Sequence, residues 1–502
     1  MVFNSYTFVF LYLPAVVILY HLINGRGSYT AGKLFLLASS LVFYCLNDMS
    51  ALPVLIGESA VNYLLSLILR KTAGNGEKDP TVRKARPDGV RRIILCTGIV
   101  LNLAALVYFK YLGFFDSIIN SLFGTGLTAG GVLLPLGISY YTFSQIAFLT
   151  DSYKNPEESC SFTDYALFVG FFPKISVGPI ALAKDMIPQF NDPIRKKANP
   201  DNIASGMVIF AAGLAKKVLL ADNLAPYVTW GYNNLDKLGT TNALIVMLAY
   251  TMQIYFDFSG YCDMAKAVCL MLNIDLPDNF LSPYRAVSVD DFWKRWHITL
   301  TSFFTRYVYI PLGGNRKGRV RTYINMFIIF FLSGLWHGAN YTFIIWGLIH
   351  GAGITLSKLL KDRTAGLPVA LRRFGTFVFI NLTWIFFRAA NMSEAFAFFR
   401  QLFSFNFISV NIELAAQATP DEMQFIQWMI LTGLNKTPYY SGCIIAIAFL
   451  LISVFISMYC KNATERLATL RFNLRTGITT VILMVLSILS LSGVTEYIYT
   501  NF

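Results

Sequence analysis

The stretch "FFLSGLWHGANYTFIIWGLIHG", residues 330–351, is almost wholly apolar and still carries two of the four histidines in the chain. It lies in a longer run, 322–357, that contains no charged residue. A single helix of that length would measure about 54 Å, whereas the hydrocarbon core of a bilayer is about 30 Å thick. We therefore expect the run to break at Gly338-Ala339-Asn340. His337 would then lie at the turn of a helical hairpin.

The charges beside this hairpin orient it. "RKGRVR" precedes the run and "KLLKDR" follows it, and short loops rich in Lys and Arg stay on the cytoplasmic side of a membrane. The hairpin thus enters from the cytoplasm and returns to it. The net charge of the chain, +13, has the same explanation, because its basic residues lie in short connections between apolar runs. No basic soluble domain is available to bind nucleic acid.

Apolar runs recur along all 502 residues, of which 55% are hydrophobic and 14% charged, against about a quarter charged in soluble domains. This predicts an all-α polytopic membrane protein, taken as one domain over 1–502 with about nine to eleven spans and both termini outside. The N-terminus has no basic residue before Arg26 and no cleavage site, which indicates a retained first span. Besides the hairpin, we expect spans near 1–22, 34–48, 51–69, 93–109, 132–149, 205–220, 242–257, 374–388, 440–459 and 476–495.

Four regions are not expected to be plain membrane spans. The loop 70–92 has eight basic residues and three acidic ones, which places it in the cytoplasm. "YALFVGFFP", within 151–200, is too short to cross and is expected to be re-entrant or interfacial. Residues 258–321 mix polar and aromatic side chains, so their backbone must be buried in protein or line a wet cavity. An amphipathic outer passage is expected over 392–436.

Histidine inside such a protein suggests proton chemistry, because its pKa near 6.5 lets it exchange a proton at cellular pH. His337 is preceded by Trp336 and followed by two small residues that allow close approach of a substrate. The residues alone leave a catalytic and a buried structural role open for His337. His350 is interpreted as a packing residue and His21 as an interfacial structural one.

A fourth histidine, His297, occurs in "SVDDFWKRWHITLT" beside Arg295 and Trp296. Acidic and basic residues at i,i+4 spacing also fit a salt-bridged surface helix. The following "YIPLGGNRKGR", with Asn315 and Arg316, offers a Gly-Gly turn and basic side chains that could hold the phosphates of a donor. Positive-inside charge alone would produce the same pattern.

One carboxylate is a further candidate for chemistry, and several known metal-binding and catalytic motifs are missing from the sequence. Asp257, in "QIYFDFSGYCDMAKA", is a candidate for orienting a histidine or binding a cation, with helix capping as the alternative. The seven cysteines show no metal-ligand spacing, and no metal site is expected. No P-loop, HExxH or GxSxG motif is present, which argues against an ATPase, a zinc protease or an α/β-hydrolase.

Taken together, these segments resemble a known family. "PLGISYYTFSQIAFLTDSYK", "FVGFFPKISVGPI", "IYFDFSGYCDMA", "NFLSPYRAVSVDDFWKRWHITLT", "YIPLGGNR" and "SGLWHGANYTFIIWGLIHG" occur in the order typical of membrane-bound O-acyltransferases of the alginate O-acetylation type. The similarity covers nearly all of 1–360, with core motifs in 132–360, and extends more loosely to the C-terminal spans, 374–495.

The resemblance implies a ring of helices around a thinned centre with a tunnel, and a catalytic role for His337 and His297. It also implies that an acetyl group passes from a cytoplasmic donor, acetyl-CoA, across a bacterial cytoplasmic membrane. No cofactor would be bound permanently. An extracytoplasmic SGNH-type transferase would then esterify a polysaccharide. Contacts with the substrate or the acyl donor are expected from Trp336, Trp296, Arg295, Asp257, Asn315 and Arg316.

One segment departs from the family pattern. Relatives often read Arg-Asp-Tyr before "LYIPLGG", where this chain has Thr305 and Arg306. Two other functions remain open at this stage. D-Alanyl transfer to teichoic acids shares the histidine motifs, and a proton-coupled transporter or flippase could use the histidines as a relay.

Overall fold

The computed structural model describes residues 1–73, 89–128, 133–417, 438–491 and 497–498. Within these ranges the chain is helical, and its only β-type pairing is an isolated bridge between Phe280 and Trp296. Nine of the described helices are long and apolar enough to cross a membrane. The prediction of an all-α polytopic protein is confirmed. A tunnel and a thinned bilayer stay predictions.

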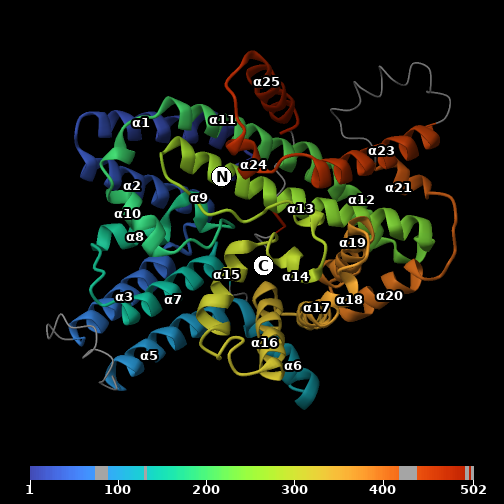
Figure 1. The fold of residues 1–502 in the computed structure, drawn as a ribbon, viewed down its shortest axis with the longest axis horizontal. Coiled ribbons are helices and arrows are strands. Elements are labelled where there is room, and N and C mark those ends of the chain that lie inside the picture. The colour runs from blue at the N-terminus through green and yellow to red at the C-terminus, as the bar shows by residue number, and fades with distance from the viewer. Residues whose placement is uncertain (74–88, 129–132, 418–437, 492–496, 499–502) are drawn as a thin grey trace.

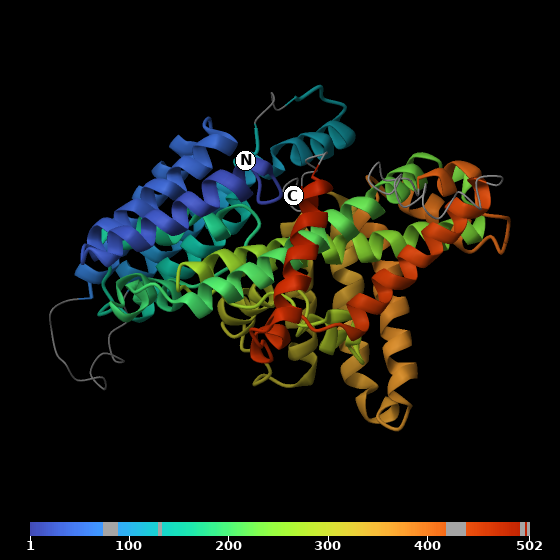
Figure 2. The same cartoon turned by 90° about the horizontal axis from the view of Figure 1, so that it is seen from above.

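The N-terminal helices form one side of the molecule, coloured blue in Figures 1 and 2. The predicted spans near 34–48 and 51–69 correspond to the helices Tyr29–Asp48 and Leu52–Lys71, whereas the predicted 93–109 span is too short, because the helix there continues to Phe123. Most of the loop 70–92 lies outside the described residues. The elements are η1 (Thr7–Tyr12), α1 (Leu13–Gly25), α2 (Tyr29–Asp48), α3 (Leu52–Lys71), α5 (Gly89–Leu106), η2 (Val107–Tyr111) and α6 (Leu112–Phe123).

The next helix, α7 (Ile138–Lys154), begins six residues later than the predicted 132–149 span. Gly137 precedes it with φ 72°, and a Cβ there would lie 1.9 Å from the carbonyl oxygen of Ile175. Only glycine permits that conformation and that approach. α7 is buried over most of its length, so it packs inside the protein instead of facing lipid.

Short helices follow where the sequence predicted no full span. The apolar piece "YALFVGFFP" falls on α8 and α9, with a break at Phe171 between them. The continuous helix Pro200–Asn233 and the long helix α13 then cross the middle of the molecule (Figure 1). The elements are α8 (Phe162–Gly170), α9 (Phe172–Ile175), α10 (Ala183–Asn191), η3 (Ile194–Lys196), α11 (Pro200–Ala215), η4 (Lys216–Ala221), α12 (Asp222–Asn233), η5 (Leu235–Lys237) and α13 (Gly239–Met271).

α13 corrects one interpretation of Asp257. The predicted span ended at residue 257 with a possible cap, but the helix runs on to Met271 and Asp257 lies in its interior. Its carboxylate forms an ion pair with Lys217 at 2.7 Å, and both side chains are only 2% exposed. The N–H of Ile498 donates to the second oxygen at 2.8 Å. The ion pair and this hydrogen bond together offset the cost of burying the Asp257 carboxylate.

Replacing Lys217 by methionine should lower the free energy of unfolding by about 3–5 kcal/mol, because Asp257 would stay buried without its cation. Thermal and denaturant unfolding of the detergent-solubilised protein would measure the loss. Lys237→Met is the matched control: its pair with Glu413 is 42% and 53% exposed, so its loss should leave the free energy of unfolding almost unchanged. Equal losses in the two variants would contradict the assignment.

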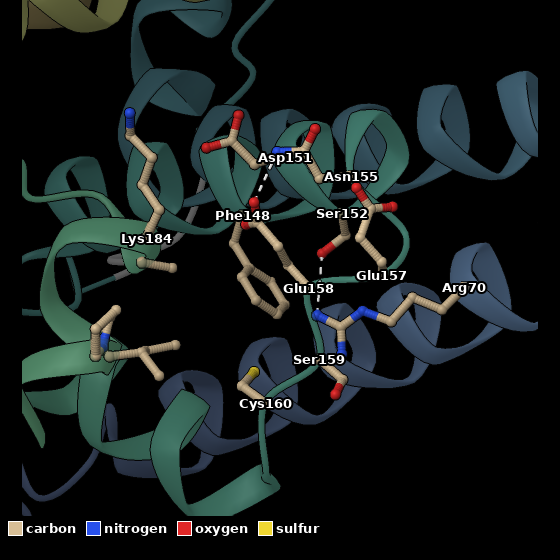
Figure 3. Close-up of a pocket in the computed structure, with 13 residues that line it drawn as sticks. Arg70, Phe148, Asp151, Ser152, Asn155, Glu157, Glu158, Ser159, Cys160 and Lys184 are labelled. Atoms are coloured by element: carbon tan, nitrogen blue, oxygen red, sulfur yellow. Dashed lines mark hydrogen bonds between the residues drawn. The ribbon is translucent and has the colours of Figure 1, made fainter. Parts of the chain in front are cut away.

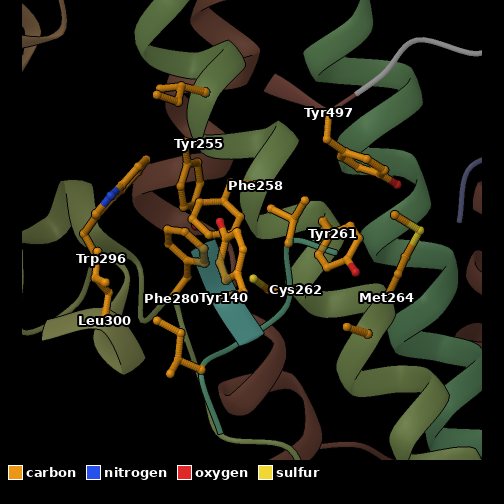
Figure 4. Close-up of a cluster of buried hydrophobic side chains, with 14 of the residues drawn as sticks. Tyr140, Tyr255, Phe258, Tyr261, Cys262, Met264, Phe280, Trp296, Leu300 and Tyr497 are labelled. Carbon is orange, nitrogen blue, oxygen red and sulfur yellow. The ribbon is translucent and has the colours of Figure 1, made fainter. Parts of the chain in front are cut away.

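The segment 279–317 supplies the irregular centre of the molecule. η6 (Pro283–Arg285), α14 (Val289–Trp293), α15 (Ile298–Phe304) and η7 (Thr305–Tyr309) are short, and long helices surround them in Figure 1. Their aromatic side chains pack against α13: Phe258 meets Phe280 edge to face, with ring centroids 4.9 Å apart, and Tyr255 lies beside Trp296 (Figure 4). The prediction that 258–321 contains no clean span holds only after residue 271, where α13 ends.

The predicted hairpin is confirmed. α16 (Arg319–His337) and α17 (Tyr341–Leu359) are separated by Gly338, Ala339 and Asn340. The two helices approach closely at glycines: a Cβ on Gly334 would lie 2.3 Å from the Phe343 carbonyl oxygen. Asn340 starts α17 as its N-cap, because its side chain accepts the N–H of Thr342 at 3.2 Å.

The helices between residues 361 and 459, drawn in orange and red, occupy the opposite side from the N-terminal ones, whereas the last helix, α25, lies over the middle of the molecule against α11 (Figures 1 and 2). The predicted spans near 374–388 and 440–459 correspond to α19 and α23, and 476–495 to the shorter α25. The predicted amphipathic passage 392–436 is described only to residue 417. The elements are α18 (Lys361–Thr364), α19 (Val369–Arg388), α20 (Met392–Leu402), α21 (Ile412–Ala416), α23 (Pro438–Tyr459), α24 (Ala463–Ala468) and α25 (Leu474–Leu489).

Candidate active site

His337 is the last residue of α16 and is 1% exposed. Aromatic rings surround its imidazole: the centroids of Trp336, Trp346 and Phe387 lie 4.9, 5.1 and 5.1 Å away. The break in the hairpin places this residue at the end of a helix inside the protein. The imidazole therefore sits in an apolar enclosure from which bulk water is excluded.

The fold brings a second histidine to the same place. The ring centroids of His297 and His337 are 6.4 Å apart, although forty positions separate them in the sequence. Trp336 touches both, with its ring 5.9 Å from that of His297. The two histidines that the sequence singled out for chemistry thus form one site.

His297 is held in a specific orientation by Asn279. Asn279 Oδ1 accepts from the backbone N–H of Thr299 at 3.2 Å and from its hydroxyl at 2.9 Å. A backbone N–H can only donate, so this atom is the amide oxygen. His297 Nδ1, 3.1 Å from the same oxygen, must therefore carry its proton and donate it. The neutral ring then has its lone pair on Nε2.

The backbone at His297 is unusual as well. His297 has φ 46°, in the left-handed region that non-glycine residues rarely adopt. The surrounding segments enforce this: Ile298 N–H donates to the Asn279 carbonyl at 3.1 Å and Leu281 N–H to that of Arg295 at 3.0 Å. Residues held in sparsely populated backbone conformations cluster at functional sites.

The other predicted residues divide into two groups. Trp336 belongs to the site, and its indole N–H donates to the Ser139 carbonyl at 3.3 Å. Trp296 is fully buried between Phe292 and Trp384, so its contacts are those of a core residue. Arg295 forms the i,i+4 ion pair with Asp291 at 2.8 Å that a salt-bridged helix predicts.

The remaining predicted residues are either exposed or bonded to other partners. Asn315 and Arg316 are exposed in the turn after η7, where Gly313 and Gly314 have positive φ as the Gly-Gly pattern predicts. Asp257 is engaged by Lys217 and Ile498 as described above. His350 accepts the Trp293 indole N–H at 3.1 Å, a structural contact as predicted.

A cavity of about 770 Å³ lies beside α15 and reaches the residues that follow His297, namely Ile298 and Thr299. Thr305 and Arg306, where the chain departs from its relatives, also line it. Lys294 lies on this cavity and on a neighbouring one that contains Lys358, at the basic end of the hairpin. By the positive-inside rule this is the cytoplasmic side.

A different cavity, of about 500 Å³, lies between the ends of α3 and α7 and the start of α10 (Figure 3). Arg70 donates to Ser152 there at 3.4 Å, and Asn155 to Glu158 at 3.1 Å. None of the residues that line it belongs to α15 or α16, so this cavity does not adjoin the helix that ends at His337. Among the described residues, no group of three His, Cys, Asp or Glu side chains is placed to hold a metal.

The sequence reasoning missed two residues. Asn279 carries no sequence signal, because its role depends on two loops meeting in space. Lys110, on η2, contacts the end of α16, and its signal was available: it is the only charged residue from 93 to 115, inside an apolar run. An ionisable residue within a span is a functional hypothesis by default.

The fold is thus a bundle of apolar helices around an irregular centre that holds two adjacent buried histidines. The chain belongs to the membrane-bound O-acyltransferase family, whose model matches residues 61–394. It is therefore a multi-pass membrane O-acyltransferase, as the sequence motifs predicted.

Named relatives extend the similarity over most of the chain. It is 36% identical to the peptidoglycan O-acetyltransferase of Helicobacter pylori over 93% of this chain and 90% of that protein. It is 37% identical to the probable alginate O-acetylase AlgI of Pseudomonas aeruginosa over 81% of this chain and 75% of that protein. The teichoic acid D-alanyltransferase of Bacillus subtilis is 28% identical over 44% of this chain and 58% of its own length.

Proposed function

We propose that this protein takes an acetyl group from a cytoplasmic donor, acetyl-CoA, and passes it across the membrane for O-acetylation of an extracellular or cell-wall polysaccharide. The juxtaposition of His337 and His297, next to a cavity whose wall includes Thr299, Lys294 and Arg306, carries the proposal. The relatives named for O-acetylation cover most of the chain, whereas the relative named for D-alanyl transfer covers less than half.

In the proposed reaction His337 is the general base. An acceptor hydroxyl loses its proton to the imidazole while its oxygen attacks the thioester carbonyl. The carbon–sulfur bond then breaks, and the imidazolium returns the proton to the departing thiolate. A positioned base contributes about 10²–10⁴-fold to such a step. The aromatic enclosure keeps out water that would hydrolyse the acyl group. A transient acyl-imidazole on His337 is an alternative route.

His297 is assigned to the donor side in this proposal. The larger cavity runs along α15 to the residues next to His297. The lone pair on Nε2 of His297, which can accept a proton, points away from Asn279. Trp336 lies against both imidazoles and would help to confine the acyl group. Asn315 and Arg316 are candidates for the donor phosphates at the cytoplasmic surface, with Arg306 on the cavity wall, whereas Arg295 is already paired with Asp291.

The proposal places the protein in a bacterial cytoplasmic membrane. Its product is the acetyl ester of the acceptor hydroxyl, from which an extracytoplasmic SGNH-type transferase would pass the acetyl group to the polysaccharide. Trp296 and Asp257 serve as structural support in this scheme, since their partners are aromatic rings and Lys217 respectively.

Mass spectrometry of envelope and secreted polymers from a deletion strain tests the function. We expect loss of O-acetyl esters, restored by the wild-type gene. Loss of D-alanyl esters with O-acetyl esters intact would contradict the acetyl assignment, and loss of the polymer itself would point to a transporter or flippase. Inverted membrane vesicles supplied with labelled acetyl-CoA, or with a D-alanyl carrier protein as control, identify the donor separately.

A further inference from the structure

Lys110 lies in an otherwise apolar helix and turns its ammonium inward. The helix Gly89–Phe123 is continuous, but its middle, η2, is a π-helical turn. Lys110 Nζ donates to the backbone carbonyl of Trp336 and, at 3.1 Å, to the hydroxyl of Ser139. It also lies over the Trp336 ring, 5.5 Å from the centroid. These are contacts with the residue directly before His337.

The neighbouring residue makes the same kind of contact. Tyr111 donates its phenolic hydrogen to the carbonyl of Leu335 at 2.6 Å. A widened π-helical turn places these consecutive side chains on one neighbouring helix end, and such turns are frequent at functional sites. Lys110 and Tyr111 together therefore cover consecutive carbonyls of the last turn of α16.

The end of α16 needs such partners. The last four carbonyls of a helix have no intrahelical donor, and inside a membrane protein water cannot replace it. Gly338 N–H serves the Gly334 carbonyl at 3.4 Å, which is a long bond. The carbonyls of Leu335 and Trp336 are served from another helix instead. A cation at a helix C-terminus also interacts favourably with the helix dipole.

We propose that Lys110 is a positioning residue: with Tyr111 it forms a cap, supplied by a separate helix, that fixes the last turn of α16 and thereby the imidazole of His337. The indole N–H of Trp336, bound to the Ser139 carbonyl, and Ser139 Oγ, bound to Lys110, close the same arrangement from α7. The catalytic part of this inference rests on the proposed function of His337, whereas the cap itself does not.

Hydrogen–deuterium exchange tests the cap without any assay of transfer. In Lys110→Met, the peptide covering 333–339 should exchange faster than in the wild type, with little change in peptides of α11 and α13. Lys196→Met is the matched control, because Lys196 is also a buried lysine over a ring, that of Tyr20, but does not contact α16. Unchanged exchange at 333–339 in Lys110→Met would overturn the proposal, even if the protein proves to be an acetyltransferase.

Kinetics then test the consequence for catalysis. Lys110→Met should lower kcat for acetyl transfer by about 100-fold, the effect of a displacement near 1 Å, with little change in KM for acetyl-CoA. Lys110→Arg, which keeps the cation, should recover most of the rate, and Tyr111→Phe should lose less than Lys110→Met. Lys196→Met should keep the wild-type kcat. A wild-type kcat in Lys110→Met, or a loss that Lys110→Arg does not relieve, would refute the positioning role.

Discussion

Replacing His337 by alanine is expected to abolish acetyl transfer while the protein still inserts into the membrane and folds. The imidazole is the proposed base, so its removal should lower the rate of acetyl transfer by about 10²–10⁴-fold, the factor that a positioned base contributes. Around it lie Trp336, Trp346 and Phe387, and these rings keep other partners: Trp346 packs on Phe387, and Trp336 packs on Phe143. Transfer of labelled acetyl by protein purified in nanodiscs measures the loss.

Two further variants make the result decisive. His337→Gln keeps a polar side chain of similar size without a proton-accepting imidazole, and should be as inactive as His337→Ala. His21→Gln is the matched control: His21 bonds the Met271 carbonyl at 2.8 Å, far from the proposed chemistry in the sequence, and its loss should leave the rate intact. Purified His337→Ala protein that transferred acetyl at the wild-type rate would show that the base assignment is wrong.

The second large effect is expected at His297. His297→Ala should lower the rate severely, on the order of 100-fold, because the donor carbonyl would lose the side chain proposed to position it. Asn279→Ala should produce a smaller loss, since the ring remains but its Nδ1–H and the groups of Thr299 lose their shared acceptor. Initial rates across acetyl-CoA concentrations separate the two effects.

The pattern of kcat and KM decides the role of His297. A rise in KM with a fall in kcat would fit donor positioning, whereas an unchanged kcat and KM in His297→Ala would mean that the residue is only part of the packing. The thermal unfolding midpoints of both variants provide the control. A fall in activity that only follows a fall in stability would also contradict the assignment.

Some elements of the fold could be predicted from the sequence, and the ends of others could not. The hairpin of α16 and α17 followed from length alone, since a chargeless run too long for one bilayer crossing has to break, and it breaks at Gly338–Asn340. The boundaries of α13 and of the helix Gly89–Phe123 were wrong by a dozen residues or more. In both cases a charged residue was taken as a boundary: Asp257 is neutralised within the fold by Lys217, and Lys110 is bonded to α16.

The candidate site, too, could be predicted only in part from the sequence. Sequence motifs singled out both histidines, and their family resemblance implied that they act together. Two other predicted contacts are occupied by structural partners, Arg295 by Asp291 and Trp296 by Phe292 and Trp384. Charge and aromatic character identify residues that need partners, but they do not say whether the partner is a substrate or another side chain.

The sequence by itself determined that this is a helical membrane protein of the O-acyltransferase family, because hydrophobic length, charge asymmetry and ordered motifs are local properties of the chain. Only the tertiary structure decided that His297 lies 6.4 Å from His337, that Asn279 sets its tautomer, and that Lys110 covers the end of α16. Those contacts join segments from 18 to 226 positions apart. Their geometry depends on how several helices pack at once, and no local pattern in the chain encodes it.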